Sequence, residues 1–182
     1  AFLADKCKNP LLIVDENIAE IPPVAFLREE LLQGKFQGDL IVTRGSEEPD
    51  YDYLDSVTDQ AHSMSPDLVV GIGGGSTLDL AKAVAVLLTN PGKGLDYRGF
   101  DKAECPGVPL MAIPTTAGTA SEVTVNAVFT DKAEKRKLGI NGKSIESTWA
   151  VLDPHFTRSA PFSVAVSSGV DAMVHVLESF VT

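Results

Sequence analysis

Short runs of apolar residues recur along the chain, and stretches with helical spacing separate them. Continuous apolar runs of this length are typical of strands buried on both faces of a parallel sheet. Their alternation with helices predicts an α/β fold with a doubly wound, mostly parallel sheet. The expected strands lie at residues 11–14, 39–43, 68–72, 108–114 and 149–152. The expected helices lie at residues 22–34, 53–64, 77–88 and from 163 to the end.

Two further features complete the expected organisation. Residues 123–130 and 136–140 are predicted to form a hairpin around a charged turn. Beyond residue 153 the pattern becomes helical only, which indicates an α/β domain over residues 1–158 and the start of a second, all-helical domain over residues 159–182. Residues 1–8 are typical of the tail of a helix, and the pattern breaks off in mid-helix at residue 182, so we expect a truncated chain.

Composition narrows the classes of partner. The apolar share of 44% and the charged share of 22% are typical of a globular protein. A formal net charge of −10 argues against nucleic acids and anionic membranes as partners. No apolar run is long enough to span a bilayer and no signal peptide is visible, so we expect a cytoplasmic protein. Cys7 and Cys105 are expected to be reduced and structurally neutral.

A glycine-rich turn, Gly73-Gly74-Gly75-Ser76, joins an expected strand to an expected helix. Because glycines expose the backbone and a helix N-terminus attracts anions, this turn suits a pyrophosphate. We expect Ser76 to cap the helix and Asp79 to complete a capping box. The alternative is a tight turn without a ligand. The strict dinucleotide fingerprint fails at Ser76, and no Gly-Lys-Ser/Thr sequence completes a phosphate-binding P-loop.

A hydroxyl-rich loop, Thr115-Thr116-Ala117-Gly118-Thr119-Ala120-Ser121, follows the strand at residues 108–114. Ligands of open α/β sheets bind beyond the carboxyl ends of the strands, so these hydroxyls are candidates for contacts with phosphate, ribose or amide groups. The alternative is a cluster of turn and cap residues, because threonine and serine favour both.

The last expected helix carries Asp171 and His175, which lie four residues apart and therefore share a face. A carboxylate and an imidazole at this spacing can ligate one divalent metal ion. The alternative is an ordinary acid–histidine pair on a helix surface, since two ligands leave a metal site incomplete.

Four segments together resemble the iron-containing (group III) alcohol dehydrogenase family. They are GGGSTLDLAK at residues 73–82, IPTTAGTASEVT at 113–124, LDP at 152–154 and GVDAMVHVLE at 169–178, in the family's order and spacing. The resemblance implies a dehydroquinate synthase-like nucleotide-binding domain followed by an all-helical domain, with the active site between them. Ala120 and Val170 depart mildly from the family's pattern.

The resemblance also implies roles for single residues. Gly74, Gly75 and Ser76 would contact the pyrophosphate of NAD, and Asp15 would hold its ribose and disfavour the 2′-phosphate of NADP. Asp50 is carried over only weakly. The other implied cofactor contacts are Thr115, Thr116, Thr119, Thr124 and Lys137, and the implied metal ligands are Asp171 and His175.

The implied activity is an NAD-dependent, metal-dependent oxidoreduction of a small alcohol or aldehyde by hydride transfer, with iron or zinc as the metal. The full-length protein would form a homo-oligomer. This chain lacks two further histidine ligands of the family and is expected to be inactive alone; no catalytic residue is assigned. The alternatives are an enzyme like glycerol dehydrogenase or dehydroquinate synthase, and a truncated, non-catalytic protein that binds a nucleotide or a partner protein.

Overall fold

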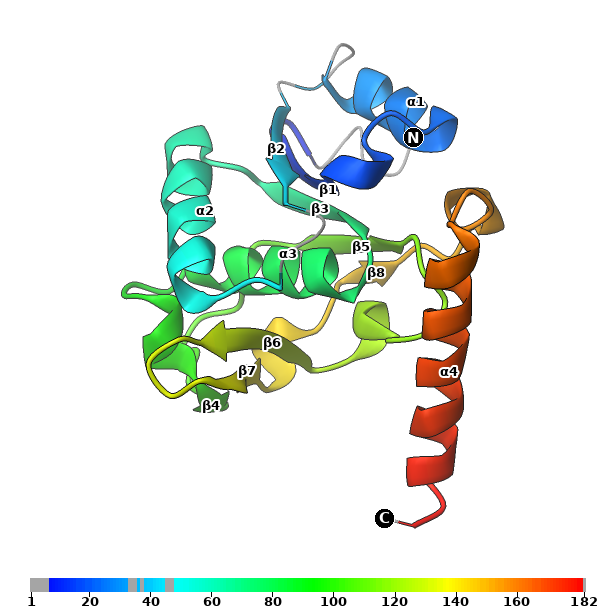
Figure 1. Ribbon diagram of the computed structural model, residues 1–182. Coiled ribbons are helices and arrows are strands. Elements are labelled where there is room, and N and C mark those ends of the chain that lie inside the picture. The colour runs from blue at the N-terminus through cyan, green and yellow to red at the C-terminus, as the bar shows by residue number, and fades with distance from the viewer. Residues whose placement is uncertain (1–6, 33–35, 37, 45–47, 182) are drawn as a thin grey trace.

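The computed structural model describes residues 7–32, 36, 38–44 and 48–181, and a five-stranded sheet forms its centre (Figure 1). The strand order is β2-β1-β3-β5-β8, and every neighbouring pair is parallel, which confirms the predicted fold class. The expected helical tail at residues 1–8 falls mostly on residues 1–6, which lie outside the described residues. The strands are β1 (Pro10–Asp15), β2 (Asp39–Thr43), β3 (Leu68–Gly73), β5 (Leu110–Pro114) and β8 (Trp149–Ala150).

Helices cover both faces of this sheet because successive strand residues point to opposite sides. On β1, Leu11 and Ile13 belong to the core formed with α2 and α3, whereas Leu12 and Val14 belong to the core that includes residues of α1 and Phe156. The sheet is therefore doubly wound. The helices are α1 (Pro22–Leu32), α2 (Tyr51–Met64), α3 (Gly75–Leu87) and α4 (Phe162–Glu178).

The strand order reverses at β1, which pairs with β2 on one side and with β3 on the other. In doubly wound sheets, ligands bind outside the carboxyl ends of the strands at such a reversal. β1 ends at Asp15, β3 at Gly73 and β5 at Pro114, so the glycine turn and the threonine loop leave the sheet from the same edge.

A second, three-stranded sheet has the order β4-β7-β6, and its β6–β7 pair is the predicted antiparallel hairpin. Helix α3 lies between the two sheets and contacts both β3 and β6 (Figure 1). Ten of its thirteen residues are buried, as its nearly uniform apolar sequence indicates. The strands are β4 (Gly99–Phe100), β6 (Asn126–Asp131) and β7 (Arg136–Asn141).

Helix α4 extends from the α/β body with every residue at least partly exposed (Figure 1). It ends at Glu178, with Ser179 as the C-cap, so the expectation of a helix continuing to the end of the chain is wrong. Short 3₁₀ turns connect the other elements, and they lie at Glu16–Ile18, Gly94–Tyr97, Ser121–Val123, Lys143–Ile145 and Pro154–Phe156.

Candidate functional site

A cavity of about 420 Å³ opens beside the N-terminus of α3. Its wall comes from α3, the loop after β5, the β6–β7 hairpin and α4, so segments far apart in sequence meet there. Seven of the predicted cofactor contacts and metal ligands line this cavity: Gly75, Ser76, Thr119, Thr124, Lys137, Asp171 and His175.

The glycine turn presents the unpaired end of a helix to this cavity. Gly74 is the N-cap of α3 in an extended conformation (φ −76°, ψ −176°), and no side chain caps the helix. A Cβ atom on Gly75 would lie 2.8 Å from Cγ2 of Thr119, and one on Gly74 would lie 3.5 Å from Cγ2 of Thr116. The turn therefore packs closely against the threonine loop, and its backbone N–H groups remain for an anion. These features fit the diphosphate of a dinucleotide.

The predicted capping box is wrong. Because α3 starts after Gly74, Ser76 is already a helical residue, and Asp79 lies too far along the helix to reach back to the cap. The Asp79 carboxylate instead accepts hydrogen bonds from the Ser121 hydroxyl at 2.5 Å and from the Val128 N–H at 2.9 Å. Through these two hydrogen bonds, Asp79 connects α3 to the wall of the cavity.

The four predicted threonines divide into two pairs. Thr115 is buried, and its N–H donates to the Gly73 carbonyl at 2.9 Å, while Thr116 lies beside Gly74. These two support the turn from behind and, among the described residues, are not part of the cavity lining. The other pair, Thr119 and Thr124, lines the cavity directly.

Helix α4 meets the threonine loop at Gly118, where a Cβ atom would lie 2.5 Å from the carbonyl oxygen of Ser168. Further along α4, Asp171 and His175 line the cavity, with Oδ1 and Nε2 3.8 Å apart. Their side chains are 42% and 51% exposed, so both remain accessible to a metal ion. Among the described residues, no group of three or more histidine, cysteine or acidic side chains is placed to hold a metal. The pair fits part of a divalent metal site.

The remaining predicted contacts lie at or beyond the rim. Lys137 is on β7, and its Nζ lies 2.5 Å from Oε1 of Glu48; both residues line the cavity. Asp15 ends β1 and accepts the Asn17 N–H at 2.8 Å, outside the lining. Asp50 is the N-cap of α2, which is a structural role, and it too lies outside the lining.

Sequence reasoning missed the buried Lys82 behind the cavity wall. Its side chain is fully buried, and its ammonium lies 3.4 Å from the Asp79 carboxylate. Burial lowers the pKa of Lys82 by disfavouring the charged form, and the charge of Asp79 opposes this shift. The available signal was a lone lysine in an otherwise apolar helix, three residues after an aspartate, because such a lysine must be buried with a partner.

Two predictions from composition can be compared with the structure. Cys7 is buried, Cys105 is exposed and both are free, which confirms that they do not form a disulfide. Within residues 7–181, apart from the gaps noted above, no helix has both the length and the apolar character needed to cross a membrane.

The chain belongs to the iron-containing alcohol dehydrogenase family, whose model matches residues 1–154. It is 35% identical over 175 residues to sulfoacetaldehyde reductase from Bilophila wadsworthia, covering 96% of this chain and 45% of that protein. It is 43% identical over 115 residues to the NAD-dependent methanol dehydrogenase of Bacillus methanolicus, covering 63% of this chain and 30% of that enzyme.

The fold matches solved structures of the same family. An iron-containing alcohol dehydrogenase from Thermotoga maritima aligns with a TM-score of 0.83 and 31% identity, covering 98% of this chain and 49% of that one. The chain therefore spans about half the length of this relative, and less than half the length of each of the two relatives named above. This agreement confirms the α/β fold class and the family resemblance that the four sequence segments indicated.

Proposed function

We propose that this chain is the nucleotide-binding part of an NAD-dependent, metal-dependent alcohol dehydrogenase. The observation that carries the proposal is one cavity bounded by the uncapped N-terminus of α3 and by the Asp171–His175 pair. An anion site and a metal-ligand pair facing each other suit a cofactor that is anchored at one end and reacts at the other. Similarity to the NAD-dependent methanol dehydrogenase supports NAD as the cofactor.

In this proposal, the chain supplies position and charge. The backbone at Gly74, Gly75 and Ser76 holds the diphosphate, and Asp15 selects the unphosphorylated ribose of NAD because a carboxylate repels a 2′-phosphate. Thr119, Thr124 and Lys137 border the cofactor, with Thr115 and Thr116 behind the turn. When bound, the nicotinamide accepts or donates a hydride, and a divalent metal, iron or zinc, acts as a Lewis acid on a small alcohol or aldehyde.

The same proposal limits what this chain does alone. It offers two metal ligands among its described residues, so we expect cofactor binding without dehydrogenase turnover. The division into a domain at residues 1–158 and a helical segment at 159–182, the homo-oligomeric state of the full-length protein and its cytoplasmic location are further parts of the proposal.

Calorimetric titration of the chain with NAD and with NADP tests the function. We expect NAD to bind more tightly than NADP, and Asp15→Ala to remove this preference. Asp59→Ala is the matched control, because it removes the same charge from an exposed position on α2, outside the cavity. Equal affinity of the wild type for NAD and NADP would disprove the role of Asp15. Absence of NAD binding would contradict the proposed cofactor site. Alcohol turnover by this chain alone would contradict the expectation that it is inactive without further metal ligands.

A further inference from the structure

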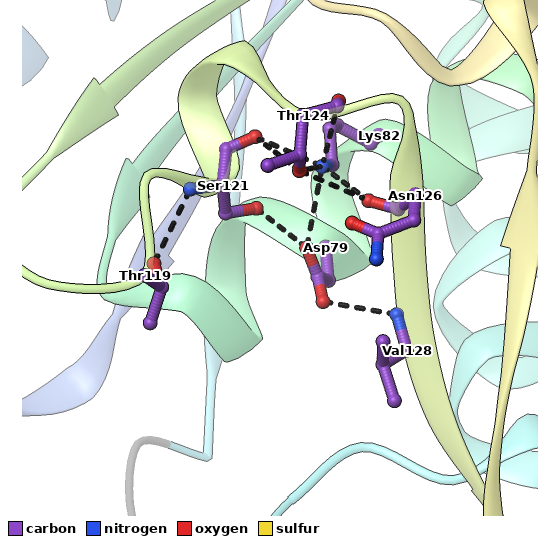
Figure 2. A network of polar contacts seen from close by, with 7 residues as sticks. All are labelled: Asp79, Lys82, Thr119, Ser121, Thr124, Asn126 and Val128. Carbon is purple, nitrogen blue, oxygen red and sulfur yellow. Dashed lines mark hydrogen bonds and ion pairs between the residues drawn. The ribbon is translucent and has the colours of Figure 1, made fainter. Parts of the chain in front are cut away.

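Behind the wall of the cavity, the ammonium group of Lys82 is surrounded by backbone oxygens. Its Nζ lies within hydrogen-bond distance of the Ser121 carbonyl at 2.9 Å, the Thr124 carbonyl at 3.3 Å, the Thr124 hydroxyl at 3.0 Å and the Asn126 carbonyl (Figure 2). The N–H groups of the ammonium are shared among these acceptors. These oxygens belong to the segment from the turn after the threonine loop to the start of β6. They converge on one fixed cation in the middle of α3.

Asp79 connects this cation to the cavity itself. One carboxylate oxygen lies 3.4 Å from the Lys82 ammonium and accepts the Ser121 hydroxyl, and the other accepts the Val128 N–H (Figure 2). Asp79, Ser121 and Val128 all line the cavity, whereas Lys82 does not. The lysine therefore reaches the cavity only through the groups that it holds.

Two physical consequences follow from this arrangement. Carbonyl groups without a strand or helix partner need another donor when they are shielded from water, and Lys82 provides one for the carbonyls of Thr124 and Asn126. It adds a second donor to the Ser121 carbonyl, which also accepts the Thr124 N–H at 3.4 Å. The cavity also carries a carboxylate, Asp79, close to the uncapped helix end that suits an anion. An unopposed carboxylate there would repel an anionic ligand, and the repulsion is strong where water is excluded.

We propose that Lys82 is a positioning residue of the cofactor cavity, which holds the wall at residues 121–128 in place and neutralises Asp79 so that an anionic ligand binds beside it. The proposal rests on the proposed function, because the anion is taken to be the diphosphate of the cofactor. Lys82 touches neither the ligand nor the metal pair; it acts through Asp79 and through the backbone of the wall.

Two ligands that share a nucleoside but differ in charge distinguish the neutralisation of Asp79 from a purely structural role of Lys82 in stabilising the fold. The probes are ADP and adenosine, titrated into the wild type, Lys82→Met and the double variant Lys82→Met/Asp79→Asn. We expect Lys82→Met to weaken ADP about tenfold or more and adenosine less than about threefold. The double variant, which removes both charges, should recover most of the ADP affinity. Lys93→Met is the matched control, because it removes an exposed ammonium group that pairs with Asp55 away from the cavity.

The single variant Asp79→Asn keeps the lysine in place, and the proposal predicts the opposite change in ADP affinity for it, namely tighter binding. If neutralisation of Asp79 matters, this variant binds ADP about threefold more tightly than the wild type or better; if the network serves only the fold, the lost hydrogen bonds weaken binding. An equal loss of ADP and adenosine affinity in Lys82→Met, together with weaker ADP binding by Asp79→Asn, would overturn the proposal.

Hydrogen exchange distinguishes failure of this proposal from failure of the function. We expect Lys82→Met to speed exchange of the Val128 amide and its neighbours in residues 119–128, while the amides of β1 and β3 keep their protection. This result does not depend on any ligand. A wild type that binds no NAD would disprove the function alone, and unchanged exchange at residues 119–128 would disprove the role of Lys82 in holding the wall.

Discussion

Alanine substitutions along the glycine turn should separate binding from stability. A Cβ atom on Gly75 would lie 2.8 Å from Cγ2, 2.9 Å from Oγ1 and 3.1 Å from Cβ of Thr119, so rotation of this side chain and a small shift of its exposed loop are needed to make room. The free energy of unfolding should therefore change by less than about 1 kcal/mol, because the better helix propensity of alanine offsets the local shift. The same methyl group stands where an anion would meet the backbone. Loss of one charge-assisted hydrogen bond costs about 1.5–3 kcal/mol, which is roughly a ten- to hundredfold loss of NAD affinity.

The other glycines provide the internal comparison. A Cβ atom on Gly73 would lie 2.6 Å from Cβ of Thr77, which the buried helix holds in place, so Gly73→Ala should lose about 1–3 kcal/mol of stability. Gly169 in α4 has nothing within 4 Å of its added Cβ, and Gly169→Ala should leave NAD binding unchanged while stabilising the helix by up to about 1 kcal/mol.

Urea denaturation and calorimetric titration with NAD measure the two effects on the same samples. Gly75→Ala should lose NAD affinity while its free energy of unfolding stays within about 1 kcal/mol of the wild-type value. If Gly75→Ala binds NAD as tightly as the wild type, the turn does not hold the diphosphate. If affinity and stability fall together, the methyl group disturbs the fold rather than the approach of the ligand.

Two further predictions concern ionisable groups. Asp131 accepts the N–H groups of Glu134 at 3.0 Å and Ala133 at 2.9 Å, and the bond from Glu134 is the main reason that its pKa is lowered. This carboxylate stabilises the fold above its unfolded pKa of about 3.9, and the stabilisation is lost as pH falls through the lower pKa of the folded state. The free energy of unfolding, measured by urea titration at several acidic pH values, should therefore fall less steeply with decreasing pH in Asp131→Asn than in the wild type. An unchanged slope would contradict this. Burial raises the pKa of Cys7 to about 12, so iodoacetamide at neutral pH should modify only the exposed Cys105 in the folded chain and both thiols in urea. Modification of both at equal rates without urea, measured by intact mass, would show that Cys7 is accessible.

The central strands could be predicted because they are buried on both faces. Such strands are apolar along their length, so the runs stand out; the run at residues 68–72 lies within β3, whose six residues are all buried. Helix α3 was predictable for the same reason, since a helix between two sheets has no polar face. The predicted strand at residues 149–152 shortens to Trp149–Ala150, at the edge of the sheet.

The network around α3 could not be predicted from local patterns. Ser76 and Asp79 have the spacing of a capping box, and local rules favour that pairing. Asp79 instead pairs with Ser121 and Val128, 42 and 49 residues away, which become neighbours only when the hairpin packs on α3. Spacing indicates which residues share a face of one element, but it does not show which distant backbone groups will need a donor.

Close backbone contacts explain why seven of the predicted cofactor and metal residues meet in one cavity. Gly75 allows the start of α3 to touch Thr119, and Gly118 allows the same loop to touch α4 at Ser168. The threonine loop thus joins the proposed anion-binding turn to the helix that carries the proposed metal-ligand pair, and Lys82 contacts the segment that follows the loop. A cofactor anchored at the turn would have its far end directed along this loop toward α4. The small residues in the two motifs are therefore as much a part of the proposed site as its charged ones, because they set the distance between its halves.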